Sequence, residues 1–171
     1  NRVDEAKALS NLGQIHHALG DLDAARECYE RSLVLRQASG DRGGEALTLK
    51  NMGVALTDMG DPLAARTYCE QALLIDRETG NRRGTGYSLT YLAMALEALG
   101  ETAGAAAAYQ EALEVRREIG QAALAIDDLA GLAVWPCCRA GRPMLWLTPR
   151  RSWPGSTPTA CRGSTTRCAF P

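Results

Sequence analysis

Apolar and small residues recur along the chain with a period of forty positions. Residues 1–40, 41–80 and 81–120 align without a gap. The repeating columns are apolar or small: Leu9, Leu49 and Leu89; Leu12, Met52 and Leu92; Leu19, Met59 and Leu99; Ala25, Ala65 and Ala105; Leu33, Leu73 and Leu113. Self-similarity at a fixed period is typical of a solenoid, in which each unit buries its apolar face against its neighbours. The pattern therefore predicts a stack of similar units.

The first half of each unit has the periodicity of an amphipathic helix. In unit one we predict this helix from about residue 4 to residue 19. Its buried stripe has i, i+3, i+7 spacing and consists of Leu9, Leu12, His16 and Leu19. A glycine follows at Gly20, Gly60 and Gly100. Glycine suits the left-handed backbone that ends many helices, so a turn is predicted at each of them.

A second helix is predicted after each of these turns. Asp21 and Asp61 can accept hydrogen bonds from the free amides of a helix start, and Pro62 fits the first helical position. Glu101 or Thr102 has this place in unit three. The inward residues of the second helix in unit one are Ala25, Tyr29, Ser32, Leu33 and Leu35, and the second helices end at Gly40, Gly80 and Gly120. Each unit is thus predicted to be a helical hairpin.

The order of residues within a unit resembles the tetratricopeptide repeat signature. The matching residues are Leu12-Gly13, His16, Ala25, Tyr29 and Ser32 in unit one; Met52-Gly53, Leu56, Ala65, Cys69 and Ala72 in unit two; and Leu92-Ala93, Leu96, Ala105, Tyr109 and Ala112 in unit three. The chain departs from the family where Leu9, Leu49 and Leu89 replace the usual Trp. Its period also exceeds the common one of about 34 residues. In this it is similar to the long-repeat subclass of bacterial regulators and adaptor proteins.

The resemblance implies an all-α fold. It would be a right-handed α-solenoid of three tetratricopeptide-type hairpins, with a truncated fourth unit at 121–133, so that residues 1–133 form one domain. It also implies a non-catalytic protein–protein interaction scaffold, part of a larger bacterial regulatory protein, that binds a peptide segment of a partner in its concave groove. Two alternatives stay open: self-association through the end repeats, or a regulatory appendage of a signalling ATPase, a cyclase or a transcription regulator.

The first helices carry a second stripe that the core does not need. Matching positions line the concave groove in tetratricopeptide proteins, so the resemblance implies a groove with Lys7, Ser10, Asn11, Gln14 and His17; Leu47, Lys50, Asn51, Val54 and Thr57; and Tyr87, Thr90, Tyr91, Met94 and Glu97. Asn11 and Asn51 match the family position whose amide clamps a ligand backbone, since an amide offers both a donor and an acceptor. Lys50 is placed to grip a terminal carboxylate. The alternative is a merely solvated helix face.

Within this stripe, Tyr87, Tyr91 and Met94 would supply an apolar anchor. Tyr91 stands where a third Asn would be expected, and the family's full Lys/Asn/Arg set for a terminal carboxylate is absent. The charged residues of the second helices, such as Arg26 and Glu30, are interpreted as a solvated outer face.

Charge and motifs exclude several other classes. The chain has 19 basic and 20 acidic residues, a formal net charge of −1, so no overall field favours nucleic acid or an anionic membrane. No apolar run approaches the roughly 18 residues of a membrane span. We find no catalytic nucleophile, phosphate loop or paired carboxylates, so we expect no enzyme activity and no cofactor. His16 and His17 point about 100° apart on a helix and predict no metal site. Cys28 and Cys69 are expected to be core residues. The protein is expected to be located in the cytoplasm.

Composition changes sharply near residue 134. Residues 134–171 contain six of the seven prolines, all three tryptophans and four of the six cysteines. A zinc or disulfide set fits poorly, because the spacing of Cys137, Cys138, Cys161 and Cys168 matches no common zinc motif. A second interpretation is a disordered Pro/Ser/Thr/Arg-rich tail. A third is a frameshift near residues 133–135 that scrambled a fourth repeat, because back-translation one base earlier permits repeat-like residues in the expected columns.

Overall fold

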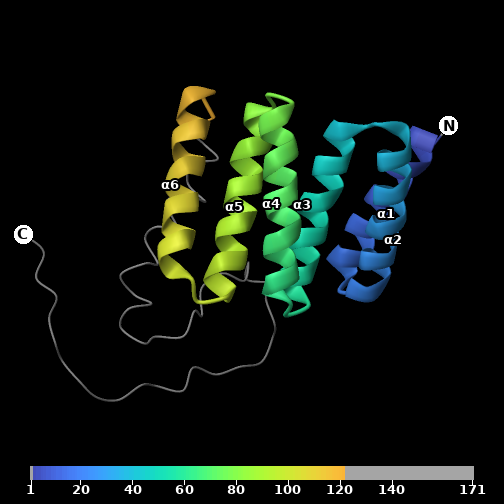
Figure 1. The fold of residues 1–171 in the computed structure, drawn as a ribbon. Helices are drawn as coiled ribbons and strands as arrows, with labels where there is room; N and C mark the ends of the chain where they lie inside the picture. Colours follow the sequence, from blue (N-terminus) through green and yellow to red (C-terminus); the bar gives the residue numbers. More distant parts are fainter. Residues whose placement is uncertain (1, 122–171) are drawn as a thin grey trace, which may run out of the picture.

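The computed structural model describes residues 2–121 as six α-helices joined by short turns (Figure 1). The helices are α1 (Arg2–Leu19), α2 (Leu22–Ser39), α3 (Arg42–Asp58), α4 (Pro62–Glu78), α5 (Arg82–Ala98) and α6 (Thr102–Glu118). They form three successive hairpins, so the predicted all-α solenoid is confirmed. The predicted partial fourth unit at 121–133 falls, apart from residue 121, outside the described residues. The tail at 134–171 lies wholly outside them.

The hairpins stack side by side in chain order (Figure 1). Each pairs a first helix with a second helix, α1 with α2, α3 with α4 and α5 with α6, and the stack is continued by α2 against α3 and α4 against α5. Successive first helices also contact each other, α1 with α3 and α3 with α5, whereas α2, α4 and α6 make at most marginal contacts with one another. The first helices therefore crowd together on one side of the stack and the second helices spread apart on the other.

Short polar side chains start most of the helices. The helices α2 to α5 each begin after a capping residue whose side chain accepts a hydrogen bond from the amide three positions on, and the caps are Asp21, Asp41, Asp61 and Asn81. These bonds satisfy amides that have no partner within the helix. Pro62 occupies the first helical position after Asp61. Glu101 precedes α6 but makes no side-chain cap bond. The helix starts predicted at Asp21 and Asp61 are confirmed.

The turn between the two helices of unit two depends on Gly60. Its φ is +82°, and glycines at the other helix ends also have positive φ. The amide of Gly60 donates to the carbonyl of Thr57 at 3.0 Å, and the next amide, of Asp61, donates to Leu56 at 2.9 Å. These bonds close the last turn of α3. A side chain would be strained in this backbone conformation, so the predicted left-handed cap is confirmed.

Within each hairpin a small residue on the first helix faces a larger one on the second. A Cβ atom added at Gly13 would lie 2.6 Å from Cε1 of Tyr29, and one at Gly53 would lie 2.5 Å from Sγ of Cys69. In unit three Ala93 and Tyr109 belong to one buried cluster. Burial raises the pKa of the Cys69 thiol to about 12, which leaves it protonated and chemically inert at neutral pH. The expected core role of Cys69 fits this environment.

The first unit differs from the others because no unit precedes it in the described structure. Leu12, Ile15 and Leu19 are 43%, 56% and 77% exposed. The residues in the same columns of unit two, such as Met52 and Ala55, are buried. What covers them is the preceding hairpin, which contributes Ala25 and Tyr29 to the same cluster. The side of α1 that no other unit covers in the described structure is therefore an exposed apolar surface.

Replacing Gly60 with Val should destabilise the protein by at least about 1 kcal/mol, because a β-branched residue resists positive φ. Gly43→Ala is the matched control. Gly43 lies inside α3 with open space around its Cβ position, so this change should stabilise by about 0.5–1 kcal/mol. Urea unfolding of both variants measures the effects. A Gly60→Val protein as stable as wild type would contradict the role of the cap.

Candidate peptide-binding face

Four columns of the first helices keep at least part of each side chain accessible. Their members are Lys7, Leu47 and Tyr87; Asn11, Asn51 and Tyr91; Gln14, Val54 and Met94; and His17, Thr57 and Glu97. All sequence-predicted groove residues except Ser10, Lys50 and Thr90 belong to these columns. Since the first helices crowd together on one side of the stack, the columns lie side by side across α1, α3 and α5. We call this set the inner face.

The prediction that Lys50 presents its charge to a ligand is wrong. Ser10, Lys50 and Thr90 form one column, and their exposed fractions are only 2%, 6% and 8%. The Nζ atom of Lys50 donates to Oδ2 of Asp76 at 2.8 Å, and Asp76 is fully buried. An isolated buried carboxylate would be unfavourable, so the lysine turns inward to neutralise it. This column belongs to the contact between the two helices of a hairpin.

Asp76 is held by a network that joins two units. Its Oδ2 atom also accepts from Oγ of Ser88 at 2.8 Å, and its Oδ1 atom accepts from Nδ2 of Asn81 at 2.8 Å. A Cβ atom at Gly84 would lie 2.2 Å from Oδ1 of Asp76, so only glycine leaves room for this carboxylate. The network therefore fixes the register of unit three on unit two.

The same column of the second helices holds a buried charge in every unit. Its members are Arg36, Asp76 and Arg116, with exposed fractions of 3%, 0% and 2%. Nη2 of Arg116 donates to Oγ1 of Thr90 at 2.8 Å, and its guanidinium lies 5.0 Å from the ring centre of Tyr87. Sequence reasoning missed these residues. The sequence did contain a signal for them. Each of these charged residues follows a repeating leucine by three positions, on the buried side of the helix, where an apolar residue is expected.

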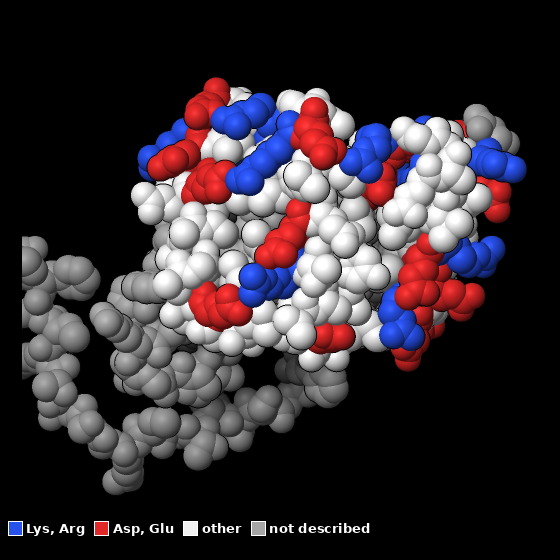
Figure 2. Space-filling view, in the orientation of Figure 1, with Lys and Arg blue, Asp and Glu red and all other residues white. Residues whose placement is uncertain are grey.

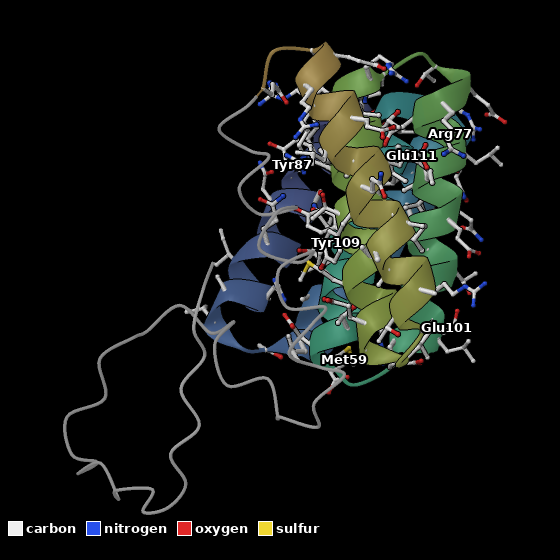
Figure 3. All side chains as sticks on the ribbon, turned by 90° about the vertical axis from the view of Figure 1, so that its left-hand side faces the viewer. Met59, Arg77, Tyr87, Glu101, Tyr109 and Glu111 are labelled. Atoms are coloured by element: carbon white, nitrogen blue, oxygen red, sulfur yellow. The ribbon has the colours of Figure 1, made fainter. Side chains whose placement is uncertain are left out.

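The aromatic residues of the inner face gather on α5. Tyr87 and Tyr91 stack with ring centres 6.4 Å apart and an angle of 29° between the rings. Met94, one turn further on, is 40% exposed. Tyr87 projects from α5 toward the left side of Figure 3, away from the outer face formed by α4 and α6. This cluster is an apolar surface with a cation beneath it, since Arg116 lies against Tyr87.

A carboxylate borders this aromatic cluster. Glu97 is partly buried, and its Oε2 atom accepts a hydrogen bond from the hydroxyl of Tyr109 at 2.9 Å. Burial raises the pKa of the Glu97 side chain, and the bond from Tyr109 offsets part of this shift. Thr57, in the same column, donates its hydroxyl to the carbonyl of Gly53 at 3.0 Å. Glu97 is therefore less readily ionised than an exposed glutamate.

The two asparagines predicted to hold a ligand backbone differ in environment. Asn11 is exposed. Asn51 is partly buried, and its Nδ2 atom is inaccessible with no hydrogen-bond partner among the described residues. An unpaired buried amide costs free energy of folding. In native proteins such a group is explained by a bound ligand, by an ordered water molecule or by local strain. Asn51 thus lies between Asn11 on α1 and the tyrosines on α5. Its amide nitrogen can still donate hydrogen bonds.

A pocket of about 440 Å³ opens between α1 and α3. Its walls come from Lys7, Ser10 and Asn11 on one side and from Gly43, Gly44 and Leu47 on the other, and Arg36 and Asp41 complete it. This is the polar end of the inner face, one unit away from the tyrosines. The pocket therefore brings Lys7 and Asn11, two sequence-predicted residues, to one site.

Comparison with known proteins agrees with this architecture. A family model described as Tetratricopeptide repeat matches residues 4–65 and 45–118, which together cover more than half of the 171 residues. The chain belongs to the tetratricopeptide repeat family. The crystal structure of BtubC (BKLC) from P. vanneervenii is similar, with a TM-score of 0.59 and 15% identity over 91% of this chain and 71% of that chain. At that identity the likeness concerns the fold alone. No curated protein matched the chain.

The outer face of the tetratricopeptide stack, formed by the second helices, is charged, and ion pairs connect neighbouring second helices. Arg77 on α4 pairs with Glu111 on α6 at 2.6 Å, and Figure 3 shows both on the side opposite Tyr87. Arg66 likewise pairs with Glu101 at 3.1 Å. Basic and acidic side chains are interspersed over the face in Figure 2. Exposed pairs of this kind contribute little stability and keep the surface solvated.

Two further features of the described residues bear on other functions. Between residues 2 and 121, no group of three or more His, Cys, Asp or Glu side chains is placed to hold a metal ion. None of the six helices combines the length and apolar character that crossing a membrane requires.

Lys50→Met should destabilise the fold by about 3–5 kcal/mol, because it leaves the buried Asp76 carboxylate without its cation. The double variant Lys50→Met/Asp76→Asn, which removes both charges, should recover part of this loss. Thermal and urea unfolding measure both. A Lys50→Met protein with wild-type stability would mean that Lys50 is a surface residue after all.

Glu97→Gln should stabilise the protein more at neutral pH than in acid. Because the pKa of Glu97 is raised on folding, its ionised form is disfavoured in the fold. Its contribution to the free energy of unfolding therefore falls as pH rises from the unfolded value of 4.5 through the raised pKa. Melting temperatures of both proteins at about pH 4 and about pH 7 test this. A difference independent of pH would contradict it.

Proposed function

We propose that the inner face of this tetratricopeptide scaffold binds a peptide segment of a partner protein. The observation that carries the proposal is the half-buried amide of Asn51, whose Nδ2 atom has no partner in the described part of the chain. Rotation of this amide about its last side-chain bond would bring Nδ2 to the surface, where a peptide backbone laid across α3 would supply the missing acceptor. The Oδ1 atom of the same side chain can accept from the next backbone amide.

The flanking residues suit such a ligand. On one side Tyr87, Tyr91 and Met94 offer an apolar seat for a side chain. On the other side Lys7, Asn11 and Gln14 are exposed and polar. A segment that spans α1, α3 and α5 would thus place an apolar residue at one end and polar residues at the other. Thr57 and Glu97 would border its path, and Lys50, committed to Asp76, takes no part.

The wider setting is also part of the proposal. The chain would be a non-catalytic module of a larger bacterial regulatory protein in the cytoplasm. The forty-residue period supports this, since it resembles the long-repeat subclass of such regulators and adaptors. The alternative of an appendage to a signalling ATPase, a cyclase or a transcription regulator differs only in what the same chain is joined to.

Self-association is a second candidate with its own observation. Leu12, Ile15 and Leu19 expose an apolar face on α1 at positions that neighbouring units cover elsewhere in the stack. A second copy could cover them in the same way. Analytical ultracentrifugation of wild type against Ile15→Glu tests this, since a charge on the face should shift any oligomer to monomer. A monomeric wild type would rule the candidate out.

Asn51→Ala should weaken peptide binding by about 1–3 kcal/mol, roughly five- to a hundred-fold, because the bound backbone loses its amide partner. The fold should keep its stability, since Nδ2 of Asn51 holds nothing in the free protein. Gln71→Ala on the exposed surface of α4 is the matched control for loss of an amide. Arg26→Ala is a second outer-face control. Both controls should bind like wild type.

The partner is identified by using the full chain as bait in pull-downs from an extract of the source cells. Calorimetry then measures the affinity of each variant for the partner's binding segment. Loss of binding in Arg26→Ala with none in Asn51→Ala would place the contact on the outer face and refute the assignment.

A further inference from the structure

Four apolar side chains form an exposed stripe along α1. Ala8, Leu12, Ile15 and Leu19 follow each other at intervals of three or four positions, so they share one side of the helix. Ala8 is exposed, and the exposed fractions of the other three are 43%, 56% and 77%. None of the four belongs to the inner face. We call this stripe the α1 edge.

The corresponding stripes of the next two units are covered by a helix. Met52 and Ala55, in the columns of the α1 edge, lie in one buried cluster with Ala25 and Tyr29 of α2. Ala95 of unit three, in the column of Ala55, is fully buried as well. Each covering helix runs antiparallel to the helix that it covers, because a short turn joins the two. An antiparallel helix is therefore the kind of element that this stripe accepts.

Two carboxylates stand at the amino-terminal end of the α1 edge. Asp4 and Glu5 are exposed, and neither forms an ion pair with another residue between 2 and 121. In unit two Glu45, in the column of Glu5, is 7% exposed, and its Oε1 atom accepts from Nε2 of Gln37 at 3.1 Å. Gln37 lies in the last turn of α2, the helix that covers α3. A helix that covers α1 in the same direction would place its last turn beside Asp4 and Glu5.

Asp4 also determines what that last turn must look like. Its column contains Gly44 and Gly84 in the next two units. A Cβ atom at Gly44 would overlap the guanidinium of Arg36, and one at Gly84 would overlap the carboxylate of Asp76. A long or acidic side chain in this position of the covering helix thus needs glycine opposite. A helix that packs on α1 in the same register therefore has a small residue opposite Asp4.

A second copy of this chain fits the α1 edge poorly. Its second helices carry Arg36, Asp76 and Arg116 in the position concerned, and the first two need glycine where α1 has Asp4. Two α1 edges packed on each other in antiparallel would bring Asp4 of one copy toward Asp21 of the other. In parallel they would bring the two Asp4 side chains together. Like charges at close range repel, so the charge pattern favours a different helix with basic residues.

We propose that the α1 edge docks an amphipathic helix of a partner protein, antiparallel to α1. The apolar stripe of this helix covers Leu12, Ile15 and Leu19, as α2 covers the same columns of α3. The residue opposite Asp4 is small, and a Lys or Arg in the last turn pairs with Glu5. The inference goes beyond the proposed function and does not depend on it, because the α1 edge and the inner face share no residue.

A library of stapled helical peptides supplies the probe. It is built on the sequence of α2 (Leu22–Ser39), with a hydrocarbon staple between Glu30 and Val34, which are exposed in α2. The randomised positions are those that face the covered helix: Ala25, Tyr29, Leu33, Arg36 and Gln37. Peptides are selected for binding to the full chain. Selected helices should be apolar at the first three positions and small at the fourth, and should have Lys or Arg at the fifth.

Matched variants of the chain locate the contact. Ile15→Glu puts a charge into the apolar stripe, and the fold should keep its stability because Ile15 is 56% exposed. Selected peptides should bind this variant at least about tenfold more weakly. Glu5→Lys should weaken peptides with a basic last turn about two- to fivefold, and versions with Glu in that turn should prefer Glu5→Lys to wild type. Asn51→Ala, on the inner face, should bind the helices like wild type.

The results separate this docking surface from the alternatives. If no helix is selected, or if Ile15→Glu binds the selected helices as wild type does, the α1 edge is not a docking site. Selected helices without a basic last turn would overturn the assigned chemistry. A wild-type dimer that Ile15→Glu dissociates would make a second copy the occupant and overturn the proposal as well. The proposed function is tested separately through Asn51, so it survives each of these results.

Discussion

No hairpin in this protein can bury its own apolar faces, and the structure depends on that constraint. A pair of antiparallel helices has two broad sides, and each needs a neighbour. Met52 and Ala55 are buried because α2 precedes them, while Leu12 and Ile15 in the same columns are exposed on α1. The position of a residue in the stack therefore decides its environment as much as its position in the repeat does.

Close approach within a hairpin comes from matched sizes. Tyr29 occupies the space left by Gly13, and Cys69 occupies the space left by Gly53. Neither glycine has an unusual backbone conformation, since among residues 2–121 φ is positive only at the glycines of the turns. Two kinds of glycine thus have separate tasks: one group admits a larger neighbour, and the other reverses the chain. Changing either would disturb the hairpin by a different physical route, overlap in one case and backbone strain in the other.

A buried polar column runs through this otherwise apolar stack. Arg36, Asp76 and Arg116 each cost desolvation energy, and each is offset differently: by Asp41, by Lys50 and by Thr90. Buried ion pairs contribute little net stability but penalise wrong pairings strongly. The column therefore specifies which unit follows which, and it also makes three similar junctions chemically distinct. This is how a repeat protein can present different ligand chemistry at equivalent sites along one face.

The period, the hairpins, the glycine turns and the caps at Asp21 and Asp61 were all determined by the sequence, because each depends on local spacing or on backbone preferences of single residues. Most of the inner face was also predictable, since repeat columns transfer from unit to unit. Lys50 was not: whether a lysine on a helix points to solvent depends on a carboxylate twenty-six positions away. The burial of the unpaired Asn51 amide likewise depends on how the helices pack, so only the tertiary structure decided it.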